Sequence, residues 1–233
     1  MVTPMKLPAA IAAVAPDGHI TPARRRRIII DMCRRRIRPG TGSSHEFLRR
    51  RTAMKFWPDL RLILQNVRWV IVGGVATRAY MPERETRDLD LLVHHLDSDD
   101  AVDCLEAAEY IRLSRLAVPG YLFRSPDGVE VDVIFGEYAW IDEALRHPHH
   151  DPAGYPVLDL PYLILMKAEA SRAQDLGDLS RMLGLASDQE LQRIRAIIRQ
   201  YAPDLSDDIE SLIFLGQMEM QAVPDAEDST GLS

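Results

Sequence analysis

The sequence predicts an α+β fold in which a small mixed β-sheet is flanked by helices, with a basic helical arm before it and a helical bundle after it. Three observations support this prediction. Short β-branched runs bounded by turn residues fill the middle of the chain, stretches with helical periodicity follow from Pro161 onward, and arginine-rich helical segments precede both. With 233 residues, of which 46% are hydrophobic and 27% charged, the chain is long enough to bury a core of this kind.

The first expected elements form the basic arm. Thr21 and Pro22 predict a helix start, because threonine is a good N-cap and proline is well tolerated at the first helical position. Pro39-Gly40 ends this helix, and a second basic helix is expected to run to about Lys55. The expected division of the chain is residues 1–57 for the arm, 58–150 for the core, 151–223 for the bundle and 224–233 for a disordered acidic tail.

The core is expected to begin with a short helix from Pro58 to Leu64 and then to change to strands. Trp69–Val72 is a fully apolar run that ends in glycine, which is typical of a buried strand. Ser125-Pro126-Asp127-Gly128 is a tight-turn sequence that predicts a hairpin. The remaining expected elements are strands at 87–93, 110–116, 121–124 and 129–135, and helices at 75–80, 98–109, 161–173, 175–183, 187–201 and 203–220.

The net charge of −7 is unevenly distributed along the chain. Residues 1–57 contain thirteen lysines and arginines and three acids, a net charge of +10, so the remaining residues carry −17. Such asymmetry predicts either an arm that binds an anionic partner such as a nucleic acid, or an arm that packs on the chain's own acidic body. A solvated basic helix without a partner is the third interpretation.

The segment after the first strand carries chemical information. The strand ends at Gly73-Gly74, where the missing side chains let a phosphate approach the backbone and the N–H groups of the following helix. Asp88 and Asp90 are two residues apart on the next expected strand, so both carboxylates project from one face. Two carboxylates this close repel each other unless a cation lies between them, and oxygen ligands favour magnesium or manganese.

A third acid lies on a later strand. In the segment 129–134, acids alternate with valines, so one face is expected to be buried and the other to present Glu130 and Asp132. Acids on an interior-type strand need a partner for their charge. Asp132 is the preferred third metal ligand because it lies deeper in the strand, and Glu130 is the alternative.

The order of these parts resembles the DNA polymerase β-like nucleotidyltransferase superfamily. The matching residues are Gly73, Gly74, Arg84, Thr86, Asp88, Leu89, Asp90 and the later strand acid. A further segment resembles the nucleotidyltransferase toxins of bacterial toxin–antitoxin and abortive-infection systems, in which a helical lysine reaches the triphosphate and an arginine followed by an acid pair closes the pocket. The residues matching that pattern are Lys167, Arg172, Asp175 and Asp178. The resemblance covers about residues 69–183.

The resemblance implies transfer of a nucleoside monophosphate from a nucleoside triphosphate to an acceptor hydroxyl, with release of pyrophosphate. Asp88, Asp90 and Asp132 would hold Mg²⁺ or Mn²⁺, and Asp132 would help deprotonate or orient the attacking hydroxyl. In a two-metal arrangement, one ion activates the nucleophile and the other stabilises the leaving phosphates.

The same resemblance assigns residues to the triphosphate. Many members carry serine where this chain has Gly74, so Thr77 or the backbone alone would take over that contact. Lys167 would neutralise triphosphate charge, with Arg84 as a second candidate, and Asp178 would either orient Lys167 or act as an additional base. The expected nucleotide-binding residues are Gly73, Gly74, Thr77, Arg84, Thr86, Lys167 and Arg172, and the expected catalytic residues are Asp88, Asp90, Asp132, Lys167 and Asp178.

The sequence is compatible with three functions. The first is a nucleotidyltransferase that modifies tRNA or a protein, acting as a toxin with a cognate antitoxin, and the basic arm favours an RNA acceptor. The second is a small-molecule nucleotidyltransferase of the antibiotic-modifying type, which an acidic body would suit. The third is a non-catalytic nucleotide-binding protein that has kept the fold.

Other features argue against alternative classes of site and compartment. Cys33 and Cys104 form no close pair, which is typical of a reducing cytoplasm, and the apolar runs are too short to span a membrane, so no membrane partner is expected. The histidines at 147, 149 and 150 are expected to lie in a loop rather than to form a metal site. His94-His95 is expected to be a strand end that lies near the acids.

Overall fold

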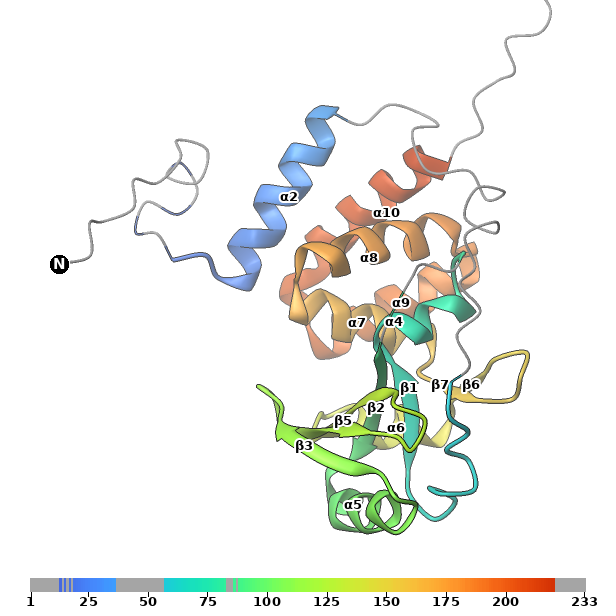
Figure 1. Ribbon diagram of the computed structural model, residues 1–233. Helices are drawn as coiled ribbons and strands as arrows, with labels where there is room; N and C mark the ends of the chain where they lie inside the picture. The colour runs from blue at the N-terminus through green and yellow to red at the C-terminus, as the bar shows by residue number, and fades with distance from the viewer. Residues whose placement is uncertain are drawn as a thin grey trace, which may run out of the picture.

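A seven-stranded mixed β-sheet forms the centre of the protein. The structure is a computed structural model that describes residues 13, 15, 17, 19–36, 57–82, 86 and 88–220. The strand order is β3-β4-β5-β2-β1-β7-β6 (Figure 1). The strands are β1 (Trp69–Val72), β2 (Asp88–His94), β3 (Ile111–Arg115), β4 (Gly120–Arg124), β5 (Glu130–Gly136), β6 (His149–His150) and β7 (Pro156–Val157).

Strand β2 occupies the middle of the sheet, and its last four residues are all buried. It pairs antiparallel with β1 and parallel with β5. In this register, Asp90 lies opposite Val72 on one side and opposite Asp132 on the other. The end of β1 and the beginnings of β2 and β5 therefore meet at one edge of the sheet.

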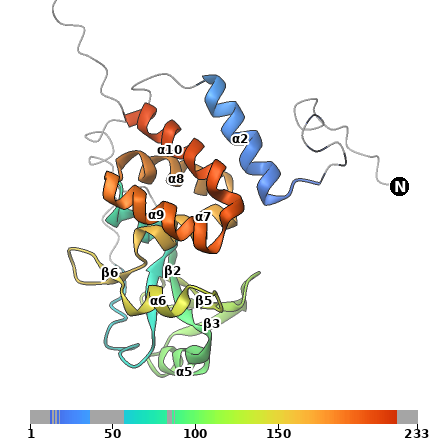
Figure 2. The same ribbon diagram turned by 180° about the vertical axis from the view of Figure 1, so that it is seen from behind.

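Helices gather in the upper part of Figure 1, and the sheet lies below them, with α5 at the far end. Figure 2 shows α9, α7 and α10 together from behind. The helices are α2 (Pro22–Arg36), α4 (Gly73–Ala76), α5 (Ser98–Ala107), α6 (Ile141–Arg146), α7 (Leu160–Ala170), α8 (Ala173–Leu185), α9 (Asp188–Tyr201) and α10 (Ser206–Met220). Short 3₁₀ turns span Thr77–Ala79, His95–Asp97 and Pro203–Leu205.

Local sequence signals explain where the C-terminal helices begin. The Asp159 side chain caps α7 by accepting from the Leu160 N–H, and the Ser187 hydroxyl and Glu190 carboxylate form a capping box at α9. The four expected C-terminal helices are present with shifted ends. Pro203 starts a 3₁₀ turn that leads into α10, whereas the sequence predicted one continuous helix from this proline.

Helix α2 packs against the C-terminal helices, beside α8 and α10 (Figures 1 and 2). Thr21 accepts from the Arg24 N–H, as expected of an N-cap. Ile30 is buried in the core, and Arg34 donates to the Ser211 hydroxyl at 2.7 Å. For this helix, the contacts agree with an arm that packs on the chain's own body. The second basic helix and the acidic tail predicted from the sequence lie outside the described residues.

Several elements differ from the sequence predictions. The expected helix from Pro58 to Leu64 is a series of turns, in which the Leu64 N–H donates to the Leu60 carbonyl at 2.8 Å. The expected histidine loop contains β6, which pairs with β7, and β7 in turn pairs with β1. Two-residue strands have no detectable period, so their sequences could not reveal them. The predicted boundary at residue 150 thus falls between two paired strands.

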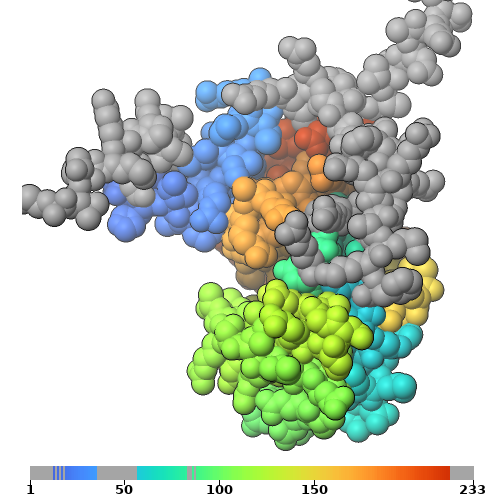
Figure 3. Space-filling model, in the orientation of Figure 1, coloured from blue at the N-terminus to red at the C-terminus, as the bar shows by residue number. Residues whose placement is uncertain are grey.

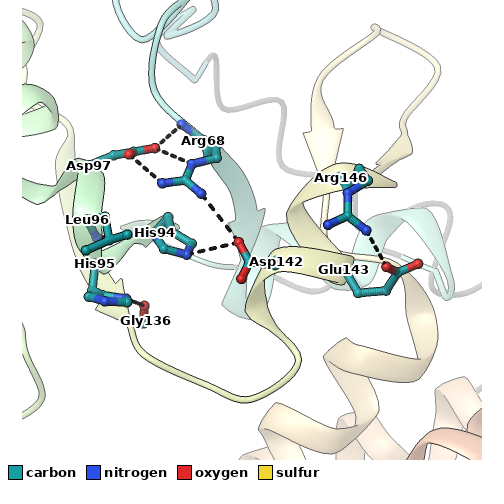
Figure 4. Close-up of polar contacts among 9 residues, drawn as sticks. All are labelled: Arg68, His94, His95, Leu96, Asp97, Gly136, Asp142, Glu143 and Arg146. Carbon is teal, nitrogen blue, oxygen red and sulfur yellow. Dashed lines mark hydrogen bonds and ion pairs between the residues drawn. The ribbon is translucent and has the colours of Figure 1, made fainter.

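The opposite end of β2 is held by a cluster of polar contacts (Figure 4). Buried His94 accepts at Nδ1 from the Leu96 N–H and lies 3.2 Å from Asp142 through Nε2. Arg68 forms a two-point contact with Asp97, at 2.7 and 2.8 Å. His94 lies six positions after Asp88 on the same strand, so at the usual rise of a strand the two residues are roughly 20 Å apart. His94-His95 is a strand end, but the expectation that it lies near the acids is wrong.

In the part of the chain that the structure describes, no helix combines the length and apolarity required to traverse a bilayer.

Candidate active site

Three carboxylates converge where β2 and β5 begin. Asp88 and Asp90 project from one face of β2, and Asp132 projects from the paired position on β5. One oxygen from each carboxylate lies within 4.8 Å of the others. Within the described residues, the three aspartates are the one cluster of potential ligands (acids, histidines or cysteines) whose spacing suits a metal ion. All six oxygens are hard ligands, so the donor set fits Mg²⁺ or Mn²⁺.

The choice of third acid follows from strand register. Asp132 lies directly opposite Asp90, whereas Glu130 lies opposite Asp88, one step nearer the strand end. Glu130 is exposed and its carboxylate is 3.4 Å from the Arg124 guanidinium. The structure therefore groups Asp132, and not Glu130, with the acids of β2.

The turn after β1 is shaped around the Asp90 carboxylate. Gly73 has φ +65°, a region that L-residues with side chains rarely adopt. A Cβ atom at this position would lie 1.9 Å from Asp90 Oδ2. The Gly74 backbone also donates a hydrogen bond to Asp90. Gly73 is therefore required both for the backbone turn and for the space that Asp90 occupies.

Gly73→Ala is expected to destabilise the fold by about 2–4 kcal/mol, because backbone strain adds to a clash in a packed site. Displacement of Asp90 should also reduce any activity of the site by about 100-fold. Gly128→Ala is the matched control, since Gly128 has φ +81° but a Cβ there meets nothing within 4 Å. Urea denaturation should show only about 1 kcal/mol lost in the control; equal losses in both variants would contradict this account.

Burial and neighbouring negative charge both act on the carboxyl groups of Asp90 and Asp132. Burial, followed by the charges of Asp88 and Asp132, raises the pKa of Asp90 to about 6. Burial, followed by the charges of Asp88 and Glu130, also raises the pKa of Asp132. Such shifts are expected where burial and like charge both disfavour the ionised carboxylate.

Arg172 is a cation whose charge reaches these acids. Its guanidinium lowers the pKa of Asp90 and of Asp132, against the larger effects that raise them. Arg172 stands at the N-terminal end of α8, where its Nε donates to Asp175 at 2.7 Å. The side chain is 71% exposed, so it remains accessible to a ligand beside the acids.

Lys167 lies in a different setting from the one expected for a residue in contact with triphosphate. Its side chain is 5% exposed, and its Nζ lies 3.1 Å from Asp175 and 2.9 Å from Asp178. Burial alone would raise the pKa of Asp175, but the Arg172 hydrogen bond and the Lys167 charge outweigh it and lower that pKa. Lys167, Asp175 and Asp178 thus form a buried ionic cluster that joins α7 to α8.

Other residues expected to contact the nucleotide lie in the turn after β1 or next to the acids. Thr77 is fully buried and its hydroxyl donates to the Gly74 carbonyl at 2.7 Å, so it holds the turn after β1. Thr86 donates to Asp88 at 3.1 Å. Gly74 is buried beside Asp90. Arg84 lies outside the described residues.

One residue beside the site carried no sequence signal. Ser171, between α7 and α8, has φ +51° and is fully buried. Left-handed serine is uncommon, and the helix predicted through residue 173 placed it inside a continuous helix. The break at Ser171 is what places Arg172 at the start of α8 rather than within α7.

The sheet and the C-terminal helices lie next to each other in the space-filling view. Figure 3 shows the yellow-green surface of β3, β4 and β5 below the orange surface of the C-terminal helices. The acids lie on strands β2 and β5, whereas Arg172 is the residue that precedes α8.

Comparisons with known proteins show similarity to solved structures but no match in sequence. No protein-family model matches this chain, and no curated protein matches its sequence. A solution structure of the antibiotic-resistance factor ANT(2'')-Ia has 18% sequence identity and a TM-score of 0.37, covering 66% of this chain and 83% of that chain. A crystal structure of ANT(2'')-Ia in complex with adenylyl-2''-tobramycin has 17% identity and a TM-score of 0.36, covering 66% and 88%.

Proposed function

We propose that this protein is a metal-dependent nucleotidyltransferase that moves a nucleoside monophosphate from a nucleoside triphosphate to an acceptor hydroxyl. The observation that carries the proposal is the convergence of Asp88, Asp90 and Asp132 beside a glycine turn that is built around Asp90. Accessible Arg172 adds a positive charge beside the acids. A site with this composition suits a substrate that brings both a hard cation and phosphate charge.

In the proposal, the three aspartates hold Mg²⁺ or Mn²⁺. When bound, the ion or ions would polarise the α-phosphate and neutralise the charge that develops on the leaving phosphates. Arg172 binds the triphosphate from the helical side as a forked donor, which is the geometry that suits phosphate oxygens. Lys167 supports this arrangement from within the buried cluster, because its ammonium is already paired with two carboxylates.

The reaction follows from this placement. The acceptor hydroxyl oxygen attacks the α-phosphorus, a new P–O bond forms, and the bond from the α-phosphorus to the bridging oxygen of the β-phosphate breaks. Pyrophosphate leaves with that oxygen. Asp132 accepts the hydroxyl proton; its side chain is partly exposed, and it lies on β5, between β2 and β4. The products are the nucleotidylated acceptor and pyrophosphate.

For the acceptor, we favour a small hydroxyl compound that carries positive charge. Three arginines of α2 that could have contacted RNA phosphates instead donate to the chain itself: Arg25, Arg26 and Arg34. Around the reacting centre, Asp88 and Glu130 are exposed acids that would attract a cation and repel a polynucleotide. A tRNA or protein acceptor, and a role as a toxin, are the competing possibilities.

A transfer assay tests this proposal. Each labelled nucleoside triphosphate is mixed with Mg²⁺ or Mn²⁺ and, in parallel, with hydroxylated amines, bulk tRNA or no added acceptor. We expect label in a small product with the wild-type protein, and a loss of at least about 10³-fold with Asp88→Asn.

Other outcomes of the assay would change the acceptor, the catalytic residues or the function itself. Label in RNA or in the protein itself, absent with Asp88→Asn, would keep the activity and overturn the choice of acceptor. Label that persists with Asp88→Asn would show that the three acids do not carry the reaction. A metal-dependent gain in nucleotide binding without any transfer would favour the non-catalytic alternative.

A further inference from the structure

The junction between α7 and α8 is held in an uncommon backbone conformation. Ser171 has φ +51° and ψ +34°, lies entirely inside the protein, and ends α7. A non-glycine residue keeps this conformation when its surroundings specify it. The next residue is Arg172, so the geometry at Ser171 sets the point from which the Arg172 side chain leaves the backbone.

The surroundings that specify Ser171 come from α2, about 145 residues earlier in the chain. The Arg26 Nη1 donates to the Ser171 hydroxyl at 2.7 Å and to the Ala168 carbonyl at 3.1 Å. The neighbouring Arg25 donates to the Ser171 carbonyl at 3.1 Å. Two successive arginines of α2 therefore hold both the side chain and the carbonyl of Ser171.

Arg26 is fixed at its other edge as well. Its Nε lies 2.7 Å from Asp208 on α10, and the residue is only 4% exposed. A buried guanidinium is costly unless its donors and charge are satisfied, and here one carboxylate, one carbonyl and one hydroxyl satisfy it. The planar fork of arginine reaches all three at once, which a lysine ammonium cannot do.

From Ser171 the contacts continue to the site. The backbone N–H and Nε of Arg172 both donate to Asp175, at 3.3 and 2.7 Å, and Asp175 also pairs with buried Lys167. The charge of the same guanidinium acts on Asp88 and Asp90. Hydrogen bonds from α2 to Ser171, the peptide link to Arg172 and the ion pairs of Asp175 thus connect α2 with the cation that interacts with Asp88 and Asp90.

We infer that Arg26 is a positioning residue for nucleotide binding: by fixing Ser171 it sets the position of Arg172 against the phosphates. This inference rests on the proposed function, because it names a residue that acts on the same site from outside it. It also gives the N-terminal helix a role in the site without any contact with substrate.

The test uses the full chain and begins with a measurement that needs no activity. Arg26→Gln removes the contacts to Ser171 and Asp208, and Arg34→Gln is the matched control, since Arg34 also joins α2 to α10 but contacts Ser211. We expect amide hydrogen exchange in residues 171–176 to become about tenfold faster in Arg26→Gln and to stay unchanged in Arg34→Gln. Unchanged exchange in Arg26→Gln would overturn the inference whatever the protein catalyses.

A third variant separates positioning from general stability. Arg26→Lys keeps a positive charge opposite Asp208 but cannot also hold Ser171 and Ala168. It should retain most of the thermal stability and still show the faster exchange in residues 171–176. If Arg26→Lys restores slow exchange, the fork of hydrogen bonds is not what holds the junction, and the inference fails.

A double-mutant cycle then asks whether Arg26 acts through Arg172. The dissociation constant of each Mg²⁺–nucleoside triphosphate is measured by calorimetry for Arg26→Gln, Arg172→Gln and the double variant. Each single change should weaken binding about tenfold, and the double variant should be no weaker than Arg172→Gln. Losses that multiply to about 100-fold would show that Arg26 acts independently and would contradict the inference. Wild-type protein that binds nucleotide but transfers nothing would count against the proposed function alone.

Discussion

Replacing Asp90 with asparagine is expected to reduce nucleotidyl transfer by at least about 10³-fold and, at the same time, to make the metal-free protein more stable. The first effect follows from loss of the acid at the centre of the three-carboxylate group. The second follows from the cost of keeping Asp90 charged among its neighbours, which raises its pKa to about 6. A residue that merely supported the fold would show the opposite change in stability.

The sign of the stability effect can be followed through the pH range. Because the folded-state pKa of Asp90 lies above the value of about 4 expected in the unfolded chain, the native protein retains a proton that the unfolded chain has released. The penalty is absent below about pH 4, grows as the pH rises to about 6, and stays constant above that. Asp90→Asn should therefore match wild type near pH 4 and exceed it by about 1–2 kcal/mol near pH 7.

The measurements are urea denaturation at several pH values without metal, followed by thermal melts with Mg²⁺. Mg²⁺ should raise the melting temperature of the wild type and not that of Asp90→Asn. Asp142→Asn is the control, because Asp142 contacts His94 at the far end of β2 and should leave transfer within about twofold of wild type. A metal-free Asp90→Asn protein that is less stable than wild type at pH 7 would contradict the proposed counter-ion site.

The acids at the site were predictable because their geometry depends mainly on local periodicity. Strand period places Asp88 and Asp90 on one face without reference to the rest of the fold. The alternation of acids and valines around Asp132 indicated the face on which its side chain lies, but the pairing of Asp90 with Asp132 depends on the parallel register of β2 and β5. The two-residue strand β7 carried no such periodicity, so sequence alone could not place it in the sheet.

The cations of the site were harder to place, since their environments are set by tertiary contacts. Lys167 has the sequence context of an ordinary helical lysine, and only the packing of α8 on α7 encloses it with Asp175 and Asp178. Arg26 stands within a run of four arginines, and nothing local distinguishes the one that becomes buried. The hydroxyl of left-handed Ser171 accepts a hydrogen bond from that same arginine. Charge composition predicted an acidic body and a basic arm, but not which arginines would join them.

Lys167→Met is expected to lower the free energy of unfolding by about 3–5 kcal/mol, the cost of removing one partner from a buried ionic cluster. Methionine fills a similar volume, so the loss comes from charge and hydrogen bonding rather than from a cavity. Asp175 would keep its contact with Arg172, but both Asp175 and Asp178 would lose the ammonium that lies within 3.1 Å of each. Urea denaturation at neutral pH measures the change.

Arg195→Met provides the contrast for this measurement. Arg195 forms a two-point ion pair with Glu210, at 2.6 and 2.9 Å, but both side chains are partly exposed, so its loss should cost less than about 1 kcal/mol. The folded-state pKa of Asp175 lies below its ordinary value, so the contribution of the cluster is complete above about pH 4 and is lost as the pH falls further. The difference between Lys167→Met and wild type should therefore shrink in acid. A Lys167→Met protein as stable as wild type, but with nucleotide binding abolished, would instead show that Lys167 leaves its cluster to contact the triphosphate.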